Sequence, residues 1–294
     1  MKRSDWLLLV LLSLPWGASF LFYRVLAQDL PPLTIALGRV AIAAAALLLA
    51  GQGDAVWRAR SHWRSFLLVG LFNNAVPFVL FAYGERTTPA GIAAICNAMT
   101  PVFTVLVARA ARRSGALGWN KWAGIALGFC GVLVLVGPAA LSGGNVRGAL
   151  ACTLAGLSYG IAALFMAPLR PLPPVTTATA QFLASTTLLL VPALALEQPW
   201  TLPPPGATTW AALLGLGLVS TALAYLIFFR LVSSAGPANA VLVTYLVPVT
   251  ALALGAAVLG EAITARAVGG ALLIALGLAV LDGRLVRRRA EAAP

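Results

Sequence analysis

Neutral polar side chains that interrupt long apolar stretches are the first candidates for chemistry in this 294-residue chain. Asn73 and Asn74 are adjacent in one stretch, and Asn97, Thr100 and Thr104 follow in the next at positions i, i+3 and i+7, which share one face of a helix. Amides and hydroxyls gathered in this way can hold the amine, amide or carboxylate of a small solute. Any single one of them is explained more simply by a bond to a neighbouring helix. For the three asparagines together we favour a binding cavity.

Aromatic rings accompany these polar groups. Trp16 and Tyr159 lie well inside their apolar stretches, and Tyr225 lies near Thr221 in another. Rings that project into a cavity offer stacking and cation–π surfaces, although core filling is the alternative. The other tryptophans lie near the ends of stretches, as expected of a membrane-interface belt. The candidate binding residues are Trp16, Asn73, Asn74, Asn97, Thr100, Tyr159, Thr221, Tyr225, Thr244 and Tyr245.

Residues typical of enzymes and metal sites are sparse. All eight Asp and Glu residues lie in loops, termini or the ends of apolar stretches, and the only histidine, His62, lies in a loop. The three cysteines have unrelated spacings, and there is no nucleophile elbow or nucleotide-binding loop. We expect no enzyme activity, no metal and no cofactor. Proton coupling would need a carboxylate at the end of a stretch, such as Glu85, or an unconventional route. A uniporter, or a carrier driven by the substrate gradient and the membrane potential, is equally consistent with the sequence.

The elements that must position these residues follow from composition. The chain is 61% hydrophobic and 10% charged, with a mean hydropathy of +0.94, whereas soluble chains are about 45–50% apolar and about 25% charged. Since a membrane-spanning helix needs about 20 apolar residues, we predict an all-α integral membrane protein with ten transmembrane helices. The predicted spans are 6–27, 33–51, 65–83, 90–108, 121–138, 147–167, 175–196, 209–230, 237–257 and 266–284.

The net charge of +12 would suggest nucleic-acid binding in a soluble protein, but here it indicates orientation. Cytoplasmic loops of membrane proteins carry an excess of Lys and Arg. We therefore predict that both termini are cytoplasmic, and we expect lipid rather than nucleic acid as a partner. Fifteen of the twenty basic residues then lie in cytoplasmic segments: Lys2, Arg3, Arg58, Arg60, Arg64, Arg109, Arg112, Arg113, Lys121, Arg170, Arg230, Arg284, Arg287, Arg288 and Arg289.

The two halves of the chain resemble each other. At an offset of 147 residues, Asn73-Asn74 falls on Ser220-Thr221 and Pro101 on Pro248. Because five spans per half is an odd number, the second copy must enter the membrane upside down. We predict two inverted five-helix repeats, over residues 1–140 and 146–287. The first stretch also has features of a signal peptide, but its match to span six favours a retained helix.

Several short motifs carry a resemblance to a known family. They are Pro15-Trp16-Gly17-Ala18-Ser19-Phe20, Pro31-Pro32-Leu33 leading into Arg39, Thr100-Pro101-Val102, Ala222-Leu223-Ala224-Tyr225, Val247-Pro248-Val249 and Leu259-Gly260-Glu261. With these motifs the chain resembles the EamA type of the drug/metabolite transporter superfamily. The resemblance implies a ten-helix carrier of small metabolites in the cytoplasmic membrane, with spans one, three, four, six, eight and nine around a cavity and spans five and ten at the periphery.

One motif departs from the family pattern, and three features have two interpretations each. Arg112-Arg113-Ser114-Gly115 replaces the Gly-Glu signature expected after span four, so Glu261 lacks a repeat counterpart. Pro101 and Pro248 can bend both halves during gating, or simply be tolerated kinks. Small residues in spans five and ten favour internal packing over a homodimer interface. Arg39, inside span two, favours a structural role over contact with an anionic substrate.

Inverted repeats recur in secondary transporters that bind substrate near the midplane. We therefore predict a secondary carrier that moves a small metabolite, such as an amino acid, an analogue or a drug-like compound, by alternating access. Export is the direction that the family resemblance favours. The alternative is a polar-lined channel or facilitator for small solutes. We expect a multi-pass protein of the cytoplasmic membrane.

Overall fold

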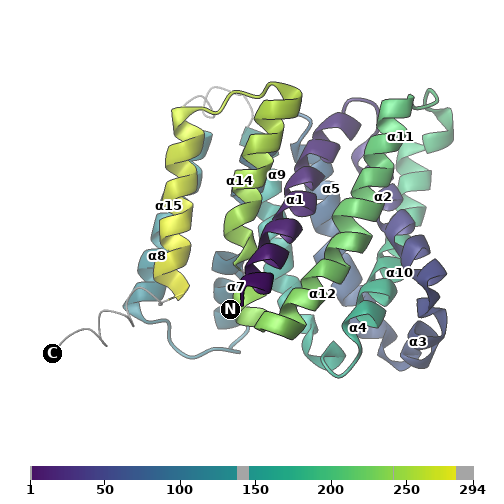
Figure 1. Cartoon of the computed structure of the whole chain (residues 1–294), viewed down its shortest axis with the longest axis horizontal. Coiled ribbons are helices and arrows are strands. Elements are labelled where there is room, and N and C mark those ends of the chain that lie inside the picture. The colour runs from purple at the N-terminus through teal and green to yellow at the C-terminus, as the bar shows by residue number, and fades with distance from the viewer. Residues whose placement is uncertain (1, 138–145, 241, 283–294) are drawn as a thin grey trace.

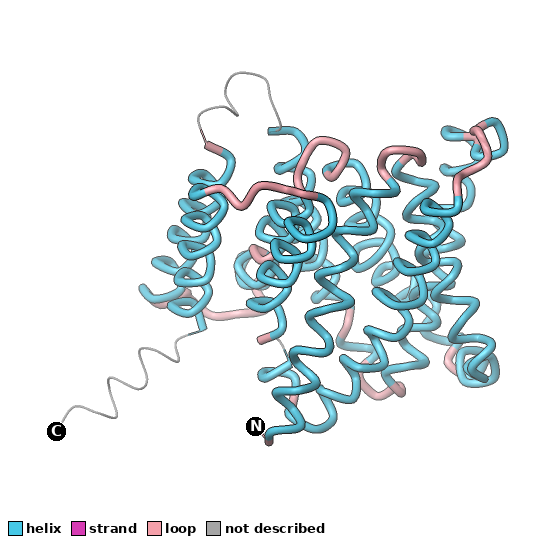
Figure 2. Tube along the Cα trace, turned by 45° about the horizontal axis from the view of Figure 1, so that its top comes forward, coloured by secondary structure: helices cyan, strands magenta, loops and turns pink. Residues whose placement is uncertain are grey.

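A computed structural model describes residues 2–137, 146–240 and 242–282. All regular secondary structure in these residues is helical, and no strand occurs among them (Figure 2). The α-helices are α1 (Arg3–Leu26), α2 (Pro32–Leu47), α3 (Gly53–Arg58), α4 (Trp63–Gly70), α5 (Val76–Gly84), α6 (Ala90–Asn97), α7 (Thr100–Ala110), α8 (Trp119–Val136), α9 (Val146–Ala162), α10 (Pro174–Pro192), α11 (Ala207–Leu214), α12 (Ala224–Ala235), α13 (Pro237–Ala240), α14 (Val243–Leu259) and α15 (Ala265–Asp282).

Short segments of other helix types join or interrupt them. The π-helical segments are η3 (Leu71–Ala75), η7 (Ala193–Glu197) and η9 (Gly215–Leu223), and the 3₁₀ segments are η2 (Arg60–His62), η5 (Ala163–Phe165), η6 (Ala167–Leu169) and η8 (Pro199–Thr201). The segment η1 (Leu48–Gln52) is a kink between α2 and α3, where Gly51 has a φ of 85°.

Seven helical segments of the described chain are long and apolar enough to cross a membrane, and three further apolar helices are shorter. The seven are Arg3–Leu26, Pro32–Arg58, Arg60–Gly84, Ala90–Ala110, Val146–Phe165, Pro174–Glu197 and Ala207–Ala235, and the shorter ones are Trp119–Leu135, Val243–Leu259 and Ala265–Leu281. The prediction of an all-α membrane protein is confirmed. Four of the cations used for orientation, Arg284, Arg287, Arg288 and Arg289, lie outside the described residues.

The helices stand side by side in one bundle, with α8 and α15 paired at one edge and α3, α4 and α10 at the other (Figure 1). Helix α1 runs through the middle and packs against α14, α12, α11 and α5. We call the end that carries the connections 27–31, 85–89, 198–206 and 260–264 the upper end, and the end where α1 begins the lower end.

Two π-helical segments occupy matching places in the two halves of the chain. Segment η3 lies 147 residues before the stretch 218–222 inside η9. Segment η1 precedes η7 by 145 residues at both boundaries, but η1 is a kink at Gly51 rather than a π-turn. A π-turn inserts a residue into the helix and leaves carbonyl groups for other donors, often at functional sites. The pair η3 and η9 contains the matched polar residues of spans three and eight.

The two prolines predicted to act in gating occupy different places in their helices. Span four is broken after Asn97, and Pro101 is the second residue of the new helix α7, where a missing N–H is harmless. Pro248 lies inside the continuous helix α14. Span nine is broken earlier, between α13 and α14.

Small residues set the distance between α8 and α15. A Cβ atom added to Gly124 would lie 2.6 Å from the carbonyl oxygen of Gly277, and one added to Gly131 would lie 2.7 Å from Ile274 Cγ1. The two helices therefore approach backbone to backbone, as small residues allow. The glycines of span five serve this internal contact, and a homodimer through these spans stays a prediction.

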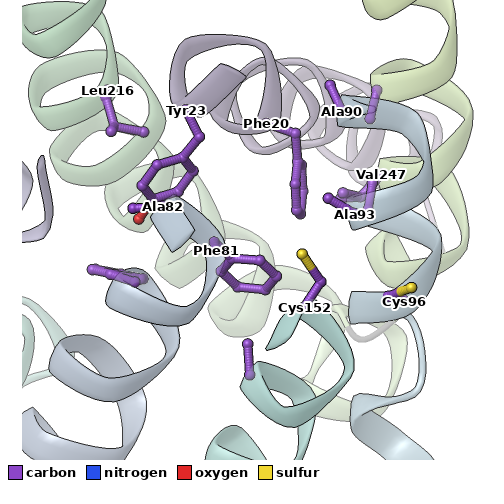
Figure 3. Close-up of a cluster of buried hydrophobic side chains, with 14 of the residues drawn as sticks. Phe20, Tyr23, Phe81, Ala82, Ala90, Ala93, Cys96, Cys152, Leu216 and Val247 are labelled. Atoms are coloured by element: carbon purple, nitrogen blue, oxygen red, sulfur yellow. The ribbon is translucent and has the colours of Figure 1, made fainter. Parts of the chain in front are cut away.

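The core beneath the upper end is aromatic and apolar. Phe20 and Tyr23 of α1 pack on Phe81 of α5 at ring-centroid distances of 5.4 and 6.3 Å, and Cys152 of α9 lies beside Phe81 (Figure 3). These side chains are buried. They separate the upper connections from the polar groups below.

Candidate substrate-binding site

A cluster of polar side chains lies between spans three, seven and eight. The Asn73 amide donates to Gln181 Oε1 and to the Tyr225 hydroxyl, both at 3.2 Å. The Asn74 amide donates to Ser185 Oγ at 3.1 Å. Asn74 and Ser185 are fully buried, whereas Asn73 and Tyr225 are partly exposed. We call Asn73, Asn74, Gln181, Ser185 and Tyr225 the polar cluster.

The π-turn of η3 supplies backbone acceptors beside this cluster. Ser185 Oγ donates to the carbonyl oxygen of Gly70 at 2.9 Å, and Ser158 Oγ of α9 donates to the carbonyl oxygen of Phe72 at 2.7 Å. A Cβ atom on Gly70 would lie 3.0 Å from the carbonyl oxygen of Gln181, so glycine permits this close approach of α4 and α10. The widened turn fixes how the two asparagines point.

Aromatic rings cover the Tyr225 side of the polar cluster. Tyr225 meets Phe182 edge-on at 5.1 Å and Trp16 at 6.4 Å, and Trp16 also contacts Phe228 at 5.4 Å. Edge-to-face packing of this kind orients rings without removing all of their π surface. Trp16 therefore belongs to the neighbourhood of the polar cluster, as a candidate binding residue should.

Arg39 is buried, and it contacts span eight one helical turn from Tyr225 of the polar cluster. Its Nε donates to Thr221 Oγ1 at 2.8 Å and its Nη1 donates to the Tyr23 hydroxyl at 2.9 Å. The guanidinium carbon lies 3.6 Å from the centroid of the Phe78 ring, a cation–π contact. Thr221 and Tyr225 are four residues apart in span eight and so share a helix face, which places Arg39 beside the polar cluster.

The remaining predicted binding residues lie elsewhere. Thr100 donates to the carbonyl oxygen of Asn97 at 2.7 Å across the break between α6 and α7, so this pair closes its own helix turn. Tyr159 packs on Phe81 at 6.4 Å. Thr244 and Tyr245 lie on α14 and make interactions of their own.

Carboxylates from one half of the chain meet helix starts of the other half at the upper end. Glu197 accepts hydrogen bonds from the backbone N–H groups of Leu33 and Thr34 at 2.9 and 2.7 Å, at the start of α2. Glu261 accepts from the N–H of Ala90 at 3.1 Å, at the start of α6. Unpaired N–H groups at a helix start attract negative charge. Glu261 thus has a role without a repeat counterpart.

Arg24 adds a second set of contacts at this end. Its guanidinium donates to the carbonyl oxygens of Glu85 and Arg86 at 2.7 and 2.9 Å and lies 3.7 Å from Glu261. Asp29 accepts a hydrogen bond from Thr209, again between the halves. These bonds hold the upper end of the structure closed.

Glu85 differs from the other carboxylates. Its side chain is fully buried, and neither carboxylate oxygen has a hydrogen-bond partner among the described residues. It lies one residue beyond the candidate span Arg60–Gly84. Burial raises the pKa of Glu85 well above its ordinary value, and the nearby Glu261 raises it further, while Arg24 and Arg39 lower it. The Glu85 carboxyl is therefore best accommodated in its neutral, protonated form.

A cavity of about 390 Å³ lies away from the polar cluster, between α3, α4 and α10. It is lined by apolar side chains such as Val56, Phe66 and Leu183. Ala180 and Ala184 line it from one face of α10, whereas Gln181 and Ser185 point from another. Within the described ranges, no three His, Cys, Asp or Glu side chains gather as metal ligands.

Two members of the polar cluster are not among the binding residues predicted from the sequence. Gln181 and Ser185 are polar residues inside the apolar stretch 175–196, and the reasoning applied to Asn73 and Asn74 would have found them. Span seven and, through Arg39, span two thus contribute polar groups, although the family resemblance does not place either span at the cavity.

Known proteins similar to this chain are transporters. A protein of Streptantibioticus cattleyicolor named "Probable terminal-alkyne amino-acid exporter" is 30% identical over 99% of this chain and 97% of its own length. A protein of Salmonella typhimurium named "Probable amino-acid metabolite efflux pump" is 31% identical over 99% of both chains. An "Uncharacterized inner membrane transporter YedA" of Escherichia coli is 28% identical over 85% of this chain and 81% of its own.

A solved crystal structure and a family model match along the whole chain. The crystal structure has a TM-score of 0.66 and 21% identity and covers 99% of this chain and 100% of its own, which supports the fold alone. The model of the EamA-like transporter family matches twice, at residues 4–137 and 146–281. The family and these relatives are membrane transporters rather than enzymes. The chain belongs to the EamA-like transporter family.

Proposed function

We propose that this protein is a secondary carrier that exports a small metabolite, such as an amino acid, an analogue or a drug-like compound, by alternating access. The observation that carries the proposal is the polar cluster with its aromatic rings, enclosed between spans three, seven and eight. Polar side chains inside membrane-spanning helices are costly and tend to mark substrate pathways. Asn73 and Tyr225 are bonded to each other and still partly exposed, so both remain available to a solute. The names of the relatives, an amino-acid exporter and an amino-acid metabolite efflux pump, support both the substrate class and the direction.

The proposed architecture is ten crossings of the cytoplasmic membrane by two inverted repeats, residues 1–140 and 146–287, with both termini cytoplasmic. The matched π-helical segments η3 and η9 and the two matches of the family model support it. In this orientation the closed upper end faces outward, and opening it would release substrate.

Within this carrier, the proposed binding residues centre on Asn73, Asn74, Tyr225 and Trp16. Thr221 is proposed to contribute indirectly, because it accepts a hydrogen bond from Arg39, which lies beside these residues. Asn97, Thr100, Tyr159, Thr244 and Tyr245 are proposed to line the rest of the path. Pro101 and Pro248 are proposed to take part in the motion.

Counterflow in proteoliposomes tests this function. Vesicles loaded with an unlabelled amino acid should transiently accumulate the same amino acid in tritiated form, across a panel of amino acids and analogues. A channel or facilitator equilibrates label without a transient excess, so a flat approach to equilibrium for every compound would contradict the carrier. Cells that lack or overproduce the protein, scored for efflux of the same panel, test the direction.

A further inference from the structure

Arg39 is a cation inside the bundle with no carboxylate of the described residues within 4.0 Å. The buried Glu85 interacts with it electrostatically over a longer distance, but burial favours the neutral form of that carboxyl. The only ion pair within 4.0 Å among the described residues joins Arg24 and Glu261 at the upper end. Arg39 is 6% exposed and contacts two hydroxyls and two aromatic rings, all of them neutral. A buried guanidinium that lacks a counter-charge is costly in a low-dielectric interior and is stabilised when an anion approaches.

The guanidinium also keeps donors for a further partner. Arginine has five N–H donors, and the bonds to Thr221 and Tyr23 occupy one on Nε and one on Nη1. Phe78 lies against its face and Tyr23 and Thr221 hold its orientation. A guanidinium fixed in this way is arranged for the two-oxygen geometry of a carboxylate.

The position of Arg39 fits a ligand that also touches the polar cluster. Thr221, which accepts from Arg39, lies one helical turn from Tyr225, which accepts from Asn73. Residues one turn apart on a helix have Cβ atoms about 5–6 Å apart, a distance that one small solute can bridge.

We propose that Arg39 binds the carboxylate of the transported solute, so that the carrier selects small molecules with a free carboxylate over their uncharged counterparts. This inference rests on the proposed function and adds its substrate class. The carboxylate lies at Arg39, and the rest of the solute lies against the Asn73 and Gln181 amides and the rings of Tyr225 and Trp16. Tyr23 and Thr221 are positioning residues, since they hold the guanidinium.

The test compares pairs of compounds that differ only at the carboxylate. Tritiated amino acids are used for counterflow, and each unlabelled amino acid and its carboxamide are used as competitors. The wild-type protein should be inhibited by the acid at a concentration at least about tenfold lower than by the carboxamide, because a charge-assisted bidentate contact is lost in the amide. Equal inhibition by acid and amide in the wild-type protein would overturn the proposal.

Variants locate the preference at Arg39. Arg39→Gln should bring the ratio of amide to acid inhibition close to one, and Arg39→Lys should keep a reduced preference for the acid. A merely structural role would weaken both competitors equally and leave the ratio intact, which would overturn the proposal. Arg170→Gln, at an exposed position, is the matched control and should keep the wild-type ratio.

The same measurements separate this proposal from the carrier function. Counterflow with a strong amide preference would sustain the carrier and refute the role of Arg39. If neither acid, amide nor any other compound of the panel gives counterflow, the carrier function itself fails and the proposal fails with it. Should Arg39→Gln not fold, Arg39→Lys carries the test: a ratio equal to that of the wild-type protein would overturn the role of Arg39, and a reduced ratio would support it.

Discussion

Asn73 is the residue at which span three meets both span seven and span eight. Its amide N–H groups donate hydrogen bonds to Gln181 and Tyr225. Its side chain is also partly exposed, which leaves it accessible to a ligand. In Asn73→Ala, both partners lose a donor, which costs about 1–3 kcal/mol when the groups stay buried and unpaired. We expect the concentration for half-maximal counterflow to rise about tenfold, which corresponds to about 1.4 kcal/mol.

Ser233→Ala is the control for this change. Ser233 is exposed on α12 and bonds only to the carbonyl oxygen of Phe229 in its own helix. It should leave the half-maximal concentration as in the wild-type protein. Wild-type affinity in Asn73→Ala would remove Asn73 from the binding site and leave it as a bond between helices.

The burial of Glu85 predicts that the stability of the folded protein depends on pH. Its pKa in the folded protein is raised by burial, whereas in the unfolded chain it returns to about 4.3. The folded state therefore keeps its full stability below about pH 4.3 and loses stability as the pH rises toward the raised pKa, because the unfolded chain gives up its proton first. We expect the thermal unfolding temperature in detergent to fall as the pH is raised through this window.

Glu85→Gln should remove this part of the pH dependence, since the amide stays neutral throughout. Asp54→Asn, which changes an exposed carboxylate of α3, should retain the wild-type slope. The charged and titratable groups near Glu85 are Arg24, Arg39, Glu261, Tyr23 and Cys152. An unaltered slope in Glu85→Gln would assign the dependence to another of these groups.

The side chains that could be predicted from the sequence are those whose polarity contrasts with their surroundings. Asn73, Asn74 and Tyr225 contrast in this way, and the structure brings them together. The burial of Glu85 could not be predicted, because a carboxylate at the end of an apolar stretch normally reaches water. Its burial follows from close packing of its neighbour Gly84 on α9, where a Cβ atom would lie 2.7 Å from the carbonyl oxygen of Gly148.

Among the elements, α2 depends on a charge from the other half of the chain. Glu197 accepts from two N–H groups in the first turn of α2 and from the Thr34 hydroxyl. In Glu197→Gln the negative charge is lost, and a single amide oxygen must accept the hydrogen bonds that two carboxylate oxygens accept in the wild-type protein. We therefore expect the free energy of unfolding to fall by about 0.5–2 kcal/mol. Hydrogen exchange should become faster at the amides of Leu33 and Thr34.

The first turn of α10, which Glu197 does not contact, is the internal control for this experiment. Its exchange should stay as in the wild-type protein. Equal acceleration at both helix starts would indicate general destabilisation rather than the loss of a cap, and unchanged exchange at α2 would show that water replaces the carboxylate without cost.

Helix positions could be predicted from the length of apolar stretches, but their internal irregularities could not. Within the described residues, each predicted span overlaps one helix or a run of two or three helical segments. The π-turns at η3 and η9 and the break before Thr100 leave no mark in an apolar stretch, because lipid-facing and protein-facing positions are both apolar and no period is visible. The repeat offset of 147 aligned η3 with part of η9 without revealing that either was π-helical.

For the whole molecule, the contacts at the upper end join the two halves. Arg24 and the start of α6 meet Glu261, the start of α2 meets Glu197, and Asp29 meets Thr209. All of these bonds are polar and near the surface, where water can replace them on opening. In the proposed carrier these contacts would break when the upper end opens, and the packed rings of Phe20, Tyr23 and Phe81 lie beneath them.

The proposed inversion of the second repeat makes a prediction about sidedness. Ser61 follows span two and Thr201 follows span seven, at corresponding places in the two proposed repeats, and both are exposed. If the second repeat is inverted, these two residues lie on opposite sides of the membrane. Cysteines introduced at Ser61 and at Thr201 should therefore react differently with a membrane-impermeant maleimide added to intact cells.

Thr201→Cys should be labelled in intact cells, and Ser61→Cys only after permeabilisation, because the Arg58, Arg60 and Arg64 cluster places the Ser61 loop inside. The background for both is Cys130→Ser, since Cys130 is exposed while Cys96 and Cys152 are buried. Labelling of both cysteines from the same side would refute the inversion. It would then also remove the structural basis for alternating access, because two parallel repeats would not present the same site to opposite faces of the membrane by rocking of one half against the other.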